Sequence, residues 1–139
     1  MPIDVSWLTE GRIIYVDGYD EITLDEMRHG EKEAFALLRD RSATPVHFIV
    51  DVEGIRSSAS SGKEFTPSIY QEPGIGEVVI IGVNQIWLRS LISFVMNLFN
   101  FPFRLASDLE DALDYIYEQD ETLPKRKRKQ KPKRGEYLD

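Results

Sequence analysis

Three polar side chains are placed where an α/β protein could bind a ligand. Asp51 and Glu53 come at the end of an apolar run over 46–51, and Asn84 follows a second apolar run over 78–83. Nearly continuous apolar runs are typical of parallel strands that are covered on both faces. Open α/β sheets bind ligands at the carboxyl ends of their strands. These residues are therefore a candidate ligand face; the alternative is that they only cap loops and form turns.

Other residue types that carry chemistry are few or poorly spaced. The 139-residue chain has no cysteine, which excludes thiol nucleophiles, disulfides and Cys–zinc sites. Its two histidines, His29 and His47, lack the spacing of a metal motif. Gly74-Ile75-Gly76 precedes a strand, so it cannot cradle a phosphate on a helix N-terminus. We expect no catalytic residue, metal or cofactor, although a Ser-His-Asp triad is spatial and sequence alone does not exclude one.

The elements that must position these residues alternate between strands and helices. The residues from Thr23 to Glu26 and from Ser107 to Glu110 have the spacing of capping boxes, which begin helices. A turn at Glu10-Gly11 predicts an N-terminal hairpin. Strands are expected at 5–8, 12–16, 46–51, 78–83 and 103–105, separated by helices after the hairpin. This order predicts one α/β domain over 1–123 with a mixed, mostly parallel sheet.

A helix expected over 86–100 is apolar nearly all round, although a surface helix normally keeps a polar face. Its covering could be a neighbouring helix and the end of the chain, a second copy in a homodimer, an apolar ligand or a membrane. Large apolar surfaces generally mark interaction sites. The candidate interaction residues are Trp87, Leu91, Phe94, Val95, Leu98 and Phe99.

The tail, residues 124–139, separates two charge populations. It carries eight of the seventeen Lys and Arg with two acids, a net charge of +6, which leaves −13 on the remainder. Its basic run begins with Lys125, Arg126, Lys127 and Arg128 and contains no apolar residue, which predicts disorder. It could bind nucleic acid or anionic membrane through phosphates, fold back on the acidic body, or merely solubilise the chain.

The order of elements over about 3–122 resembles the STAS domain, the fold of the anti-sigma-factor antagonist SpoIIAA, including a branch labelled STAS/SEC14. The likeness rests on the strand Val46–Asp51, on the helix start Asp108 to Leu113, and on Gly82-Val83-Asn84 before an Arg-bearing apolar helix. The resemblance implies a phosphorylated serine after the central strand. Ser60 and Ser61 lie at that distance, in Ala59-Ser60-Ser61-Gly62, where Ala59 replaces the family's acid.

Two functions follow as expectations. The first is a non-enzymatic STAS-like interaction or regulatory module, whose partner is another protein or a second copy of the chain. The alternative is a binder of a small apolar or lipid-like ligand, with the tail contacting anionic surfaces. The first residues lack the basic and apolar regions of a secretory signal, and the most apolar window is interrupted by polar residues. We expect a cytoplasmic protein.

Overall fold

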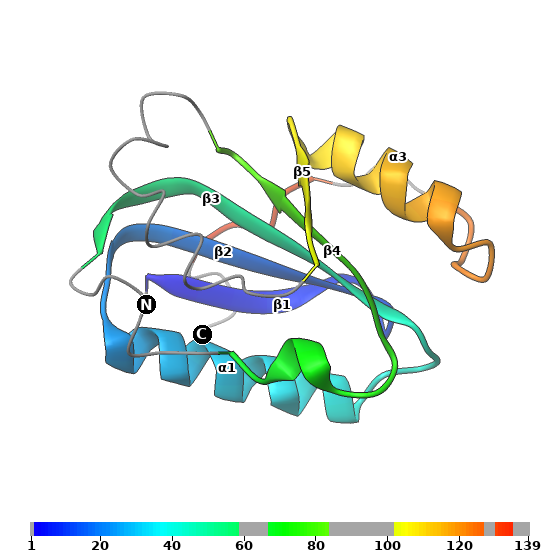
Figure 1. Ribbon diagram of the computed structural model, residues 1–139, viewed down its shortest axis with the longest axis horizontal. Helices are drawn as coiled ribbons and strands as arrows, with labels where there is room; N and C mark the ends of the chain where they lie inside the picture. Colours follow the sequence, from blue (N-terminus) through cyan, green and yellow to red (C-terminus); the bar gives the residue numbers. More distant parts are fainter. Residues whose placement is uncertain (1, 59–66, 84–101, 127–129, 135–139) are drawn as a thin grey trace.

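Five strands form one sheet in the order β1-β2-β3-β4-β5 (Figure 1). The computed structural model describes residues 2–58, 67–83, 102–126 and 130–134. The strands are β1 (Ile3–Thr9), β2 (Ile13–Ile22), β3 (Val46–Ser58), β4 (Ile75–Ile81) and β5 (Arg104–Ala106). β1 runs antiparallel to β2, and all other neighbours are parallel. The predicted α/β class, with an N-terminal hairpin on a mixed and mostly parallel sheet, is confirmed.

Helices lie on both faces of this sheet. Helix α1 (Leu24–Arg39) packs on one face together with the short 3₁₀ helix η1 (Ile69–Gln71), and helix α3 (Leu109–Gln119) packs on the other (Figure 1). Side chains alternate between the faces of a strand. On β2, Ile14 accordingly joins the core under α1, while Ile13 and Tyr15 join the core under α3. All three are at most 1% exposed.

Two strands extend far beyond their predicted C-terminal ends. β2 continues to Ile22 and β3 to Ser58, well beyond the expected ends at Val16 and Asp51. Charged residues and glycines such as Gly18 and Gly54 obscure the strand pattern there, yet the two strands remain paired as far as Ile22 and Ser58. The expected helix over 86–100 lies outside the described residues. Among the described residues, no helix is long and apolar enough to cross a membrane.

A buried network ties the segment after α3 to the amino ends of β2 and β3. Arg12 donates to Asp120 Oδ2 over 2.9 Å, and His47 Nε2 lies 2.8 Å from the same oxygen. Thr122 donates to Asp120 Oδ1 through its amide and its hydroxyl, at 2.9 and 2.6 Å. The Glu77 amide donates to His47 Nδ1, so the proton of the neutral ring is on Nε2, facing Asp120. His47 thus stabilises the fold at the end of the strands opposite the candidate ligand face.

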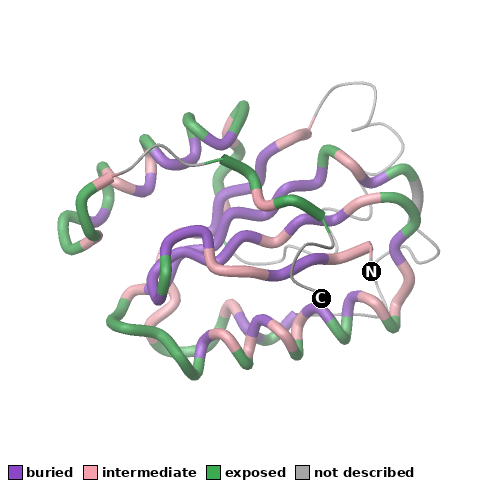
Figure 2. Tube along the Cα trace, turned by 180° about the vertical axis from the view of Figure 1, so that it is seen from behind, coloured by how far each residue is buried: buried purple, intermediate pink, exposed green. Residues whose placement is uncertain are grey.

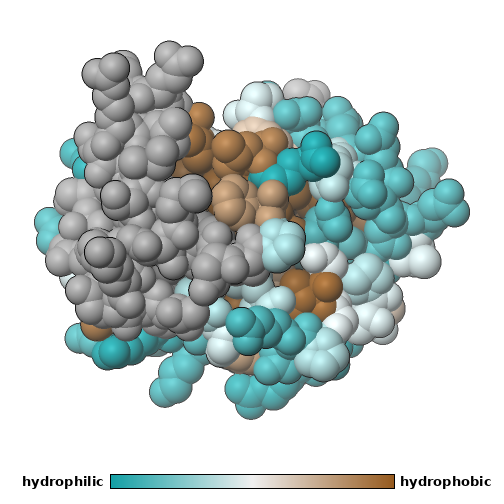
Figure 3. Space-filling view, in the orientation of Figure 1, coloured by the Kyte–Doolittle hydropathy of each residue, from teal (hydrophilic) through white to brown (hydrophobic). Residues whose placement is uncertain are grey.

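Apolar surface remains over β4 and β5. Figure 3 shows a hydrophobic area over the upper part of β4, next to residues drawn in grey. Leu105, on the neighbouring β5, is 55% exposed. This area belongs to the edge of the sheet farthest from the N-terminal hairpin.

Candidate functional site

Three buried aspartates lie side by side across β1, β2 and β3. Asp4 pairs with Asp17 in the antiparallel register, and Asp17 pairs with Asp51 in the parallel one. Their side chains share the face that carries α3, because they alternate with residues packed under α1. Exposure is only 4% for Asp4, 6% for Asp17 and 1% for Asp51. We call these three residues the aspartate row. Like charges at neighbouring sheet positions are unfavourable, and buried charges need partners.

Two cations from the tail are paired with the aspartate row. Lys131 Nζ lies 2.8 Å from Asp51 Oδ2 and 3.1 Å from Glu53 Oε2. Arg134 contacts both oxygens of Asp17, Nε at 2.7 Å and Nη2 at 3.2 Å. Figure 2 shows residues 130–134 as the mostly exposed segment crossing in front of the sheet on this side. One alternative from the sequence was that the tail folds back on the acidic body, and residues 131 and 134 make contacts of that kind.

Burial shapes the protonation of the groups beside these cations. Tyr15 donates its hydroxyl to Asp51. Burial, helped by that hydrogen bond and by the charge of Asp51, raises the pKa of Tyr15 far above its ordinary value. Burial also raises the pKa of Asp17, although Arg134 opposes the shift. The side chain of Lys131 loses some hydration, but Asp51 and Glu53 outweigh that loss and raise its pKa.

The guanidinium group of Arg134 has two further neighbours. It lies over the ring of Tyr19, with its central carbon 4.6 Å from the ring centroid. Gly54 leaves room beside it, since a Cβ on Gly54 would stand 2.5 Å from Arg134 Nη2. The hydroxyl of Tyr19 donates to Asp4 over 3.2 Å. Burial, with the nearby charge of Asp4, raises the pKa of Tyr19 to about 12, so the ring is neutral beside the cation.

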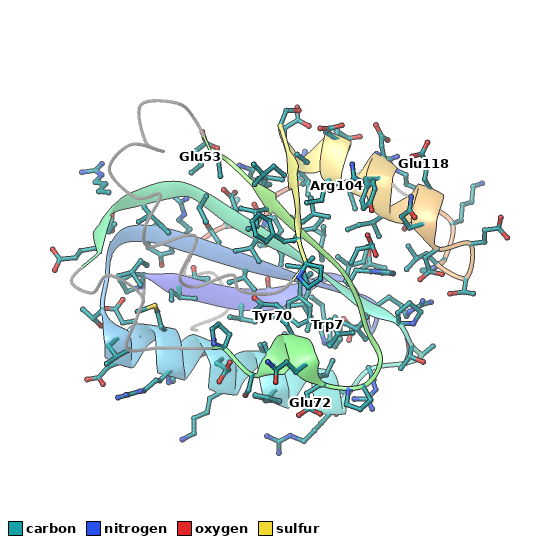
Figure 4. All side chains as sticks on the ribbon, viewed as in Figure 1. Trp7, Glu53, Tyr70, Glu72, Arg104 and Glu118 are labelled. Carbon is teal, nitrogen blue, oxygen red and sulfur yellow. The ribbon has the colours of Figure 1, made fainter. Side chains whose placement is uncertain are left out.

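The end of β4 comes close to the other cation site. Gly82 has φ +85°, a conformation that favours glycine. A Cβ there would stand 2.6 Å from Glu53 Cβ and 2.9 Å from Asp51 Oδ1. Asp51 Oδ1 accepts the amide of Glu53 over 3.0 Å, which fixes the carboxylate while Oδ2 faces Lys131. Figure 4 shows Glu53 at this end of the sheet, away from Glu72 and Glu118.

The structure brings together only part of the predicted site. Asp51 and Glu53 lie in it, but midway along β3 and not at its end as predicted, with Asp51 paired to Ile81, the last residue of β4. Asn84 lies outside the described residues. The same holds for Ser60, Ser61, Lys127, Arg128 and the six residues predicted on the apolar helix. Lys125 is exposed, and Arg126 pairs with Glu110 and Asp114 on α3 instead of with the aspartate row.

Sequence reasoning missed Asp4, Asp17 and the two tail cations. The signal for Asp17 was present, because Tyr15-Val16-Asp17 and Ile49-Val50-Asp51 are parallel strand segments of the same type. In-register pairing of the two segments puts their aspartates next to each other. Nothing local marked Arg134, which meets Asp17 across 117 positions of sequence.

This arrangement is suited to binding cations. The aspartates of β2 and β3 face fixed positive charges, and the raised pKa of Tyr15 keeps its proton in place near neutral pH. Within the described ranges, no group of three or more His, Asp and Glu side chains could hold a metal ion.

The chain matches no protein-family model and no curated protein, so its resemblance to STAS domains rests on the element order and residues given above.

Proposed function

We propose that the chain is a non-enzymatic, STAS-like interaction module that binds a cationic protein segment along the aspartate row. One observation supports this: buried Asp17 and Asp51 each pair with a cation from a separate, mostly exposed segment of chain. A carboxylate out of water strongly favours a charged hydrogen-bond donor. The side chains of Lys131 and Arg134 are 43% and 46% exposed. Solvent therefore weakens their pairing, and another basic segment can replace them.

Binding of a basic peptide tests the proposal. The full chain with Lys131→Ala and Arg134→Ala leaves the aspartate row open, and a labelled peptide of residues 125–134 is the probe. We expect fluorescence anisotropy to show saturable binding. Adding Asp17→Asn and Glu53→Gln to this chain should lower its affinity for the peptide about tenfold or more, because each charged hydrogen bond contributes roughly 1.5–3 kcal/mol.

A matched pair of substitutions controls for net charge. Glu72 and Glu118 are exposed and lie away from Glu53 (Figure 4). Glu72→Gln with Glu118→Gln removes the same two charges, and we expect less than about a twofold change because screened, distant charges interact weakly. Absence of peptide binding, or equal weakening by both pairs, would contradict the proposal.

A pocket under α1 favours a second function, binding of a small apolar ligand. Its volume is about 80 Å³, and its lining is mostly apolar. The lining side chains include Ile3, Val16, Met27, Ala34, Val50 and Tyr70. The pocket is on the opposite face from the aspartate row, so the two functions are separable. Homodimerisation through residues 86–100 and phosphorylation of Ser60 or Ser61 stay predictions.

Thermal unfolding with a short alcohol such as hexanol tests the pocket. A ligand that binds only the folded state raises the melting temperature. We expect a rise for the unsubstituted chain and a smaller one for Val16→Phe, whose ring would fill the space. An equal rise for both chains, or none for the unsubstituted chain, would rule out this ligand site.

A further inference from the structure

The surroundings of Arg134 differ from those of Lys131 in a way that distinguishes arginine from lysine. We infer that the aspartate row recognises a Lys-x-x-Arg segment through an arginine-selective pocket, and that residues 131–134 of the tail are its resident ligand. This inference rests on the proposed function and names the partner's chemistry. It concerns the segment Lys131-Pro132-Lys133-Arg134.

Three features of the Arg134 pocket fit a guanidinium group. The carboxylate of Asp17 accepts from Nε and Nη2 at the same time, a fork that the single nitrogen of lysine cannot match. The ring of Tyr19 offers its face at 4.6 Å, where a planar cation stacks well. Gly54 leaves free the space that Nη2 occupies. An ammonium group would lose the fork and most of the stacking.

The lysine of the segment is bound differently, by two carboxylates. Lys131 Nζ lies between Asp51 Oδ2 and Glu53 Oε2, at 2.8 and 3.1 Å, as suits a compact point charge. Pro132 and Lys133, together with Asp17, Glu53 and Gly54, line the hollow between the two cation sites. Lys133 is exposed. The two pockets therefore fix a spacing of three residues between a lysine and an arginine.

The tail must leave before another segment can bind. A partner with the same spacing would contact the same two aspartates, so the tail competes with it at high effective concentration. Replacing Lys131 and Arg134 should consequently raise the affinity for a Lys-x-x-Arg peptide added in trans. Lys133→Ala, which removes one positive charge without vacating either pocket, should not.

Three peptides of equal charge separate recognition from simple attraction. The full chain with Lys131→Ala and Arg134→Ala is titrated with three peptides. The first has the sequence of residues 130–135, the second has Lys in place of its Arg, and the third has the Arg exchanged with the Lys before it. We expect both altered peptides to bind about five- to tenfold more weakly, since the fork and the stacking are specific to arginine at that spacing. In the same chain, Tyr19→Leu should reduce the preference for Arg to what the Asp17 fork provides, whereas Tyr19→Phe, which keeps the ring, should retain it in full.

The outcomes distinguish this inference from the proposed function. Equal binding of all three peptides would overturn the arginine pocket and leave a charge-only interaction module. Loss of selectivity in both Tyr19 variants would also overturn the pocket's design. Binding of none of the peptides would reject the proposed function itself. Equal affinity of the unsubstituted and the Lys131→Ala, Arg134→Ala chains for the first peptide would show that the tail is not the resident ligand.

Discussion

Asp120 and the aspartate row are buried carboxylates at opposite ends of the same strands, and they are satisfied in different ways. The row depends on half-exposed tail cations, whereas Asp120 has four donors: Arg12, His47, and the amide and hydroxyl of Thr122. Burial by itself would raise the pKa of Asp120, but hydrogen bonds from Thr122 and His47 outweigh it and lower the pKa to about 2. The row is thus paired with side chains that solvent reaches, whereas Asp120 ties the segment after α3 to the amino ends of β2 and β3.

Thr122→Val tests this account of Asp120. A carboxyl whose folded pKa is depressed stabilises the fold above its ordinary pKa of 3.8, and that stability is lost as pH falls toward about 2. Removing the Thr122 hydroxyl should raise the pKa of Asp120, so acid unfolding should begin at a higher pH. Carboxyl carbon NMR and denaturation at several pH values measure both effects.

Thr9→Val is the matched control for Thr122→Val. The hydroxyl of Thr9 is buried and has no hydrogen-bond partner within the described ranges. The same substitution there should leave the titration of Asp120 unchanged. If both variants shifted the titration equally, the hydroxyl of Thr122 would not be the cause.

Of these contacts, the sequence located only the acidic partners of Lys131. Asp51 and Glu53 were placed at a strand end by the apolar run before them. Asp17 was not recognised as a site residue. The strand was predicted to end at Val16, so Asp17 fell in the loop after it. Arg12 and Asp120 meet across 108 positions, and no local pattern of charge or polarity joins residues that far apart.

Helix α3 begins one residue later than its capping box suggested. The N-cap is Asp108, which accepts the amide of Asp111 over 2.9 Å, whereas the expected N-cap was Ser107. Asp111 reaches back instead and accepts the amide and hydroxyl of Ser107, at 3.0 and 3.2 Å. For α1 the prediction was right, since Thr23 caps the amide of Glu26. Two acceptors in a row, Ser107 and Asp108, made the second start ambiguous.

Two alanine substitutions separate these alternatives. Asp108→Ala removes the N-cap and should lower the free energy of unfolding by about 1 kcal/mol. Ser107→Ala removes only an exposed hydroxyl contact and should cost less than about 0.5 kcal/mol. Urea denaturation measures both, and a larger loss for Ser107→Ala would place the cap where the sequence pattern put it.

The elements themselves were more predictable than their ends. Apolar periodicity identifies buried strands and helix faces, so the hairpin, the parallel order and both described helices were anticipated. It fails where a strand continues through polar residues, as β2 does across Gly18 and Asp20, the latter at φ 56°. Pairing with β3 continues there and sustains the strand against its own composition.

Over the whole molecule, charge is divided between an acidic body and a basic tail, and within the described ranges the two meet at two places. Arg126 pairs with Glu110 and Asp114 on α3, while Lys131 and Arg134 pair with Asp51, Glu53 and Asp17. The sequence revealed the two charge populations but not the positions of contact. These contacts occupy tail cations that would otherwise be free to bind a polyanion.

Removing the acidic partners of the tail cations should therefore strengthen the tail's binding to nucleic acid. Asp17→Asn with Glu53→Gln releases Arg134 and loosens Lys131, and we expect tighter binding of a labelled single-stranded DNA. Release of Arg134 should steepen the dependence of log affinity on log salt by about 0.7, since each phosphate neutralised on a single strand contributes roughly that amount. Glu72→Gln with Glu118→Gln changes net charge equally but releases no tail residue, so its salt dependence should match that of the unsubstituted chain. Equal slopes for the two double variants would mean that net charge alone governs binding and that the tail is not held by the aspartate row in solution.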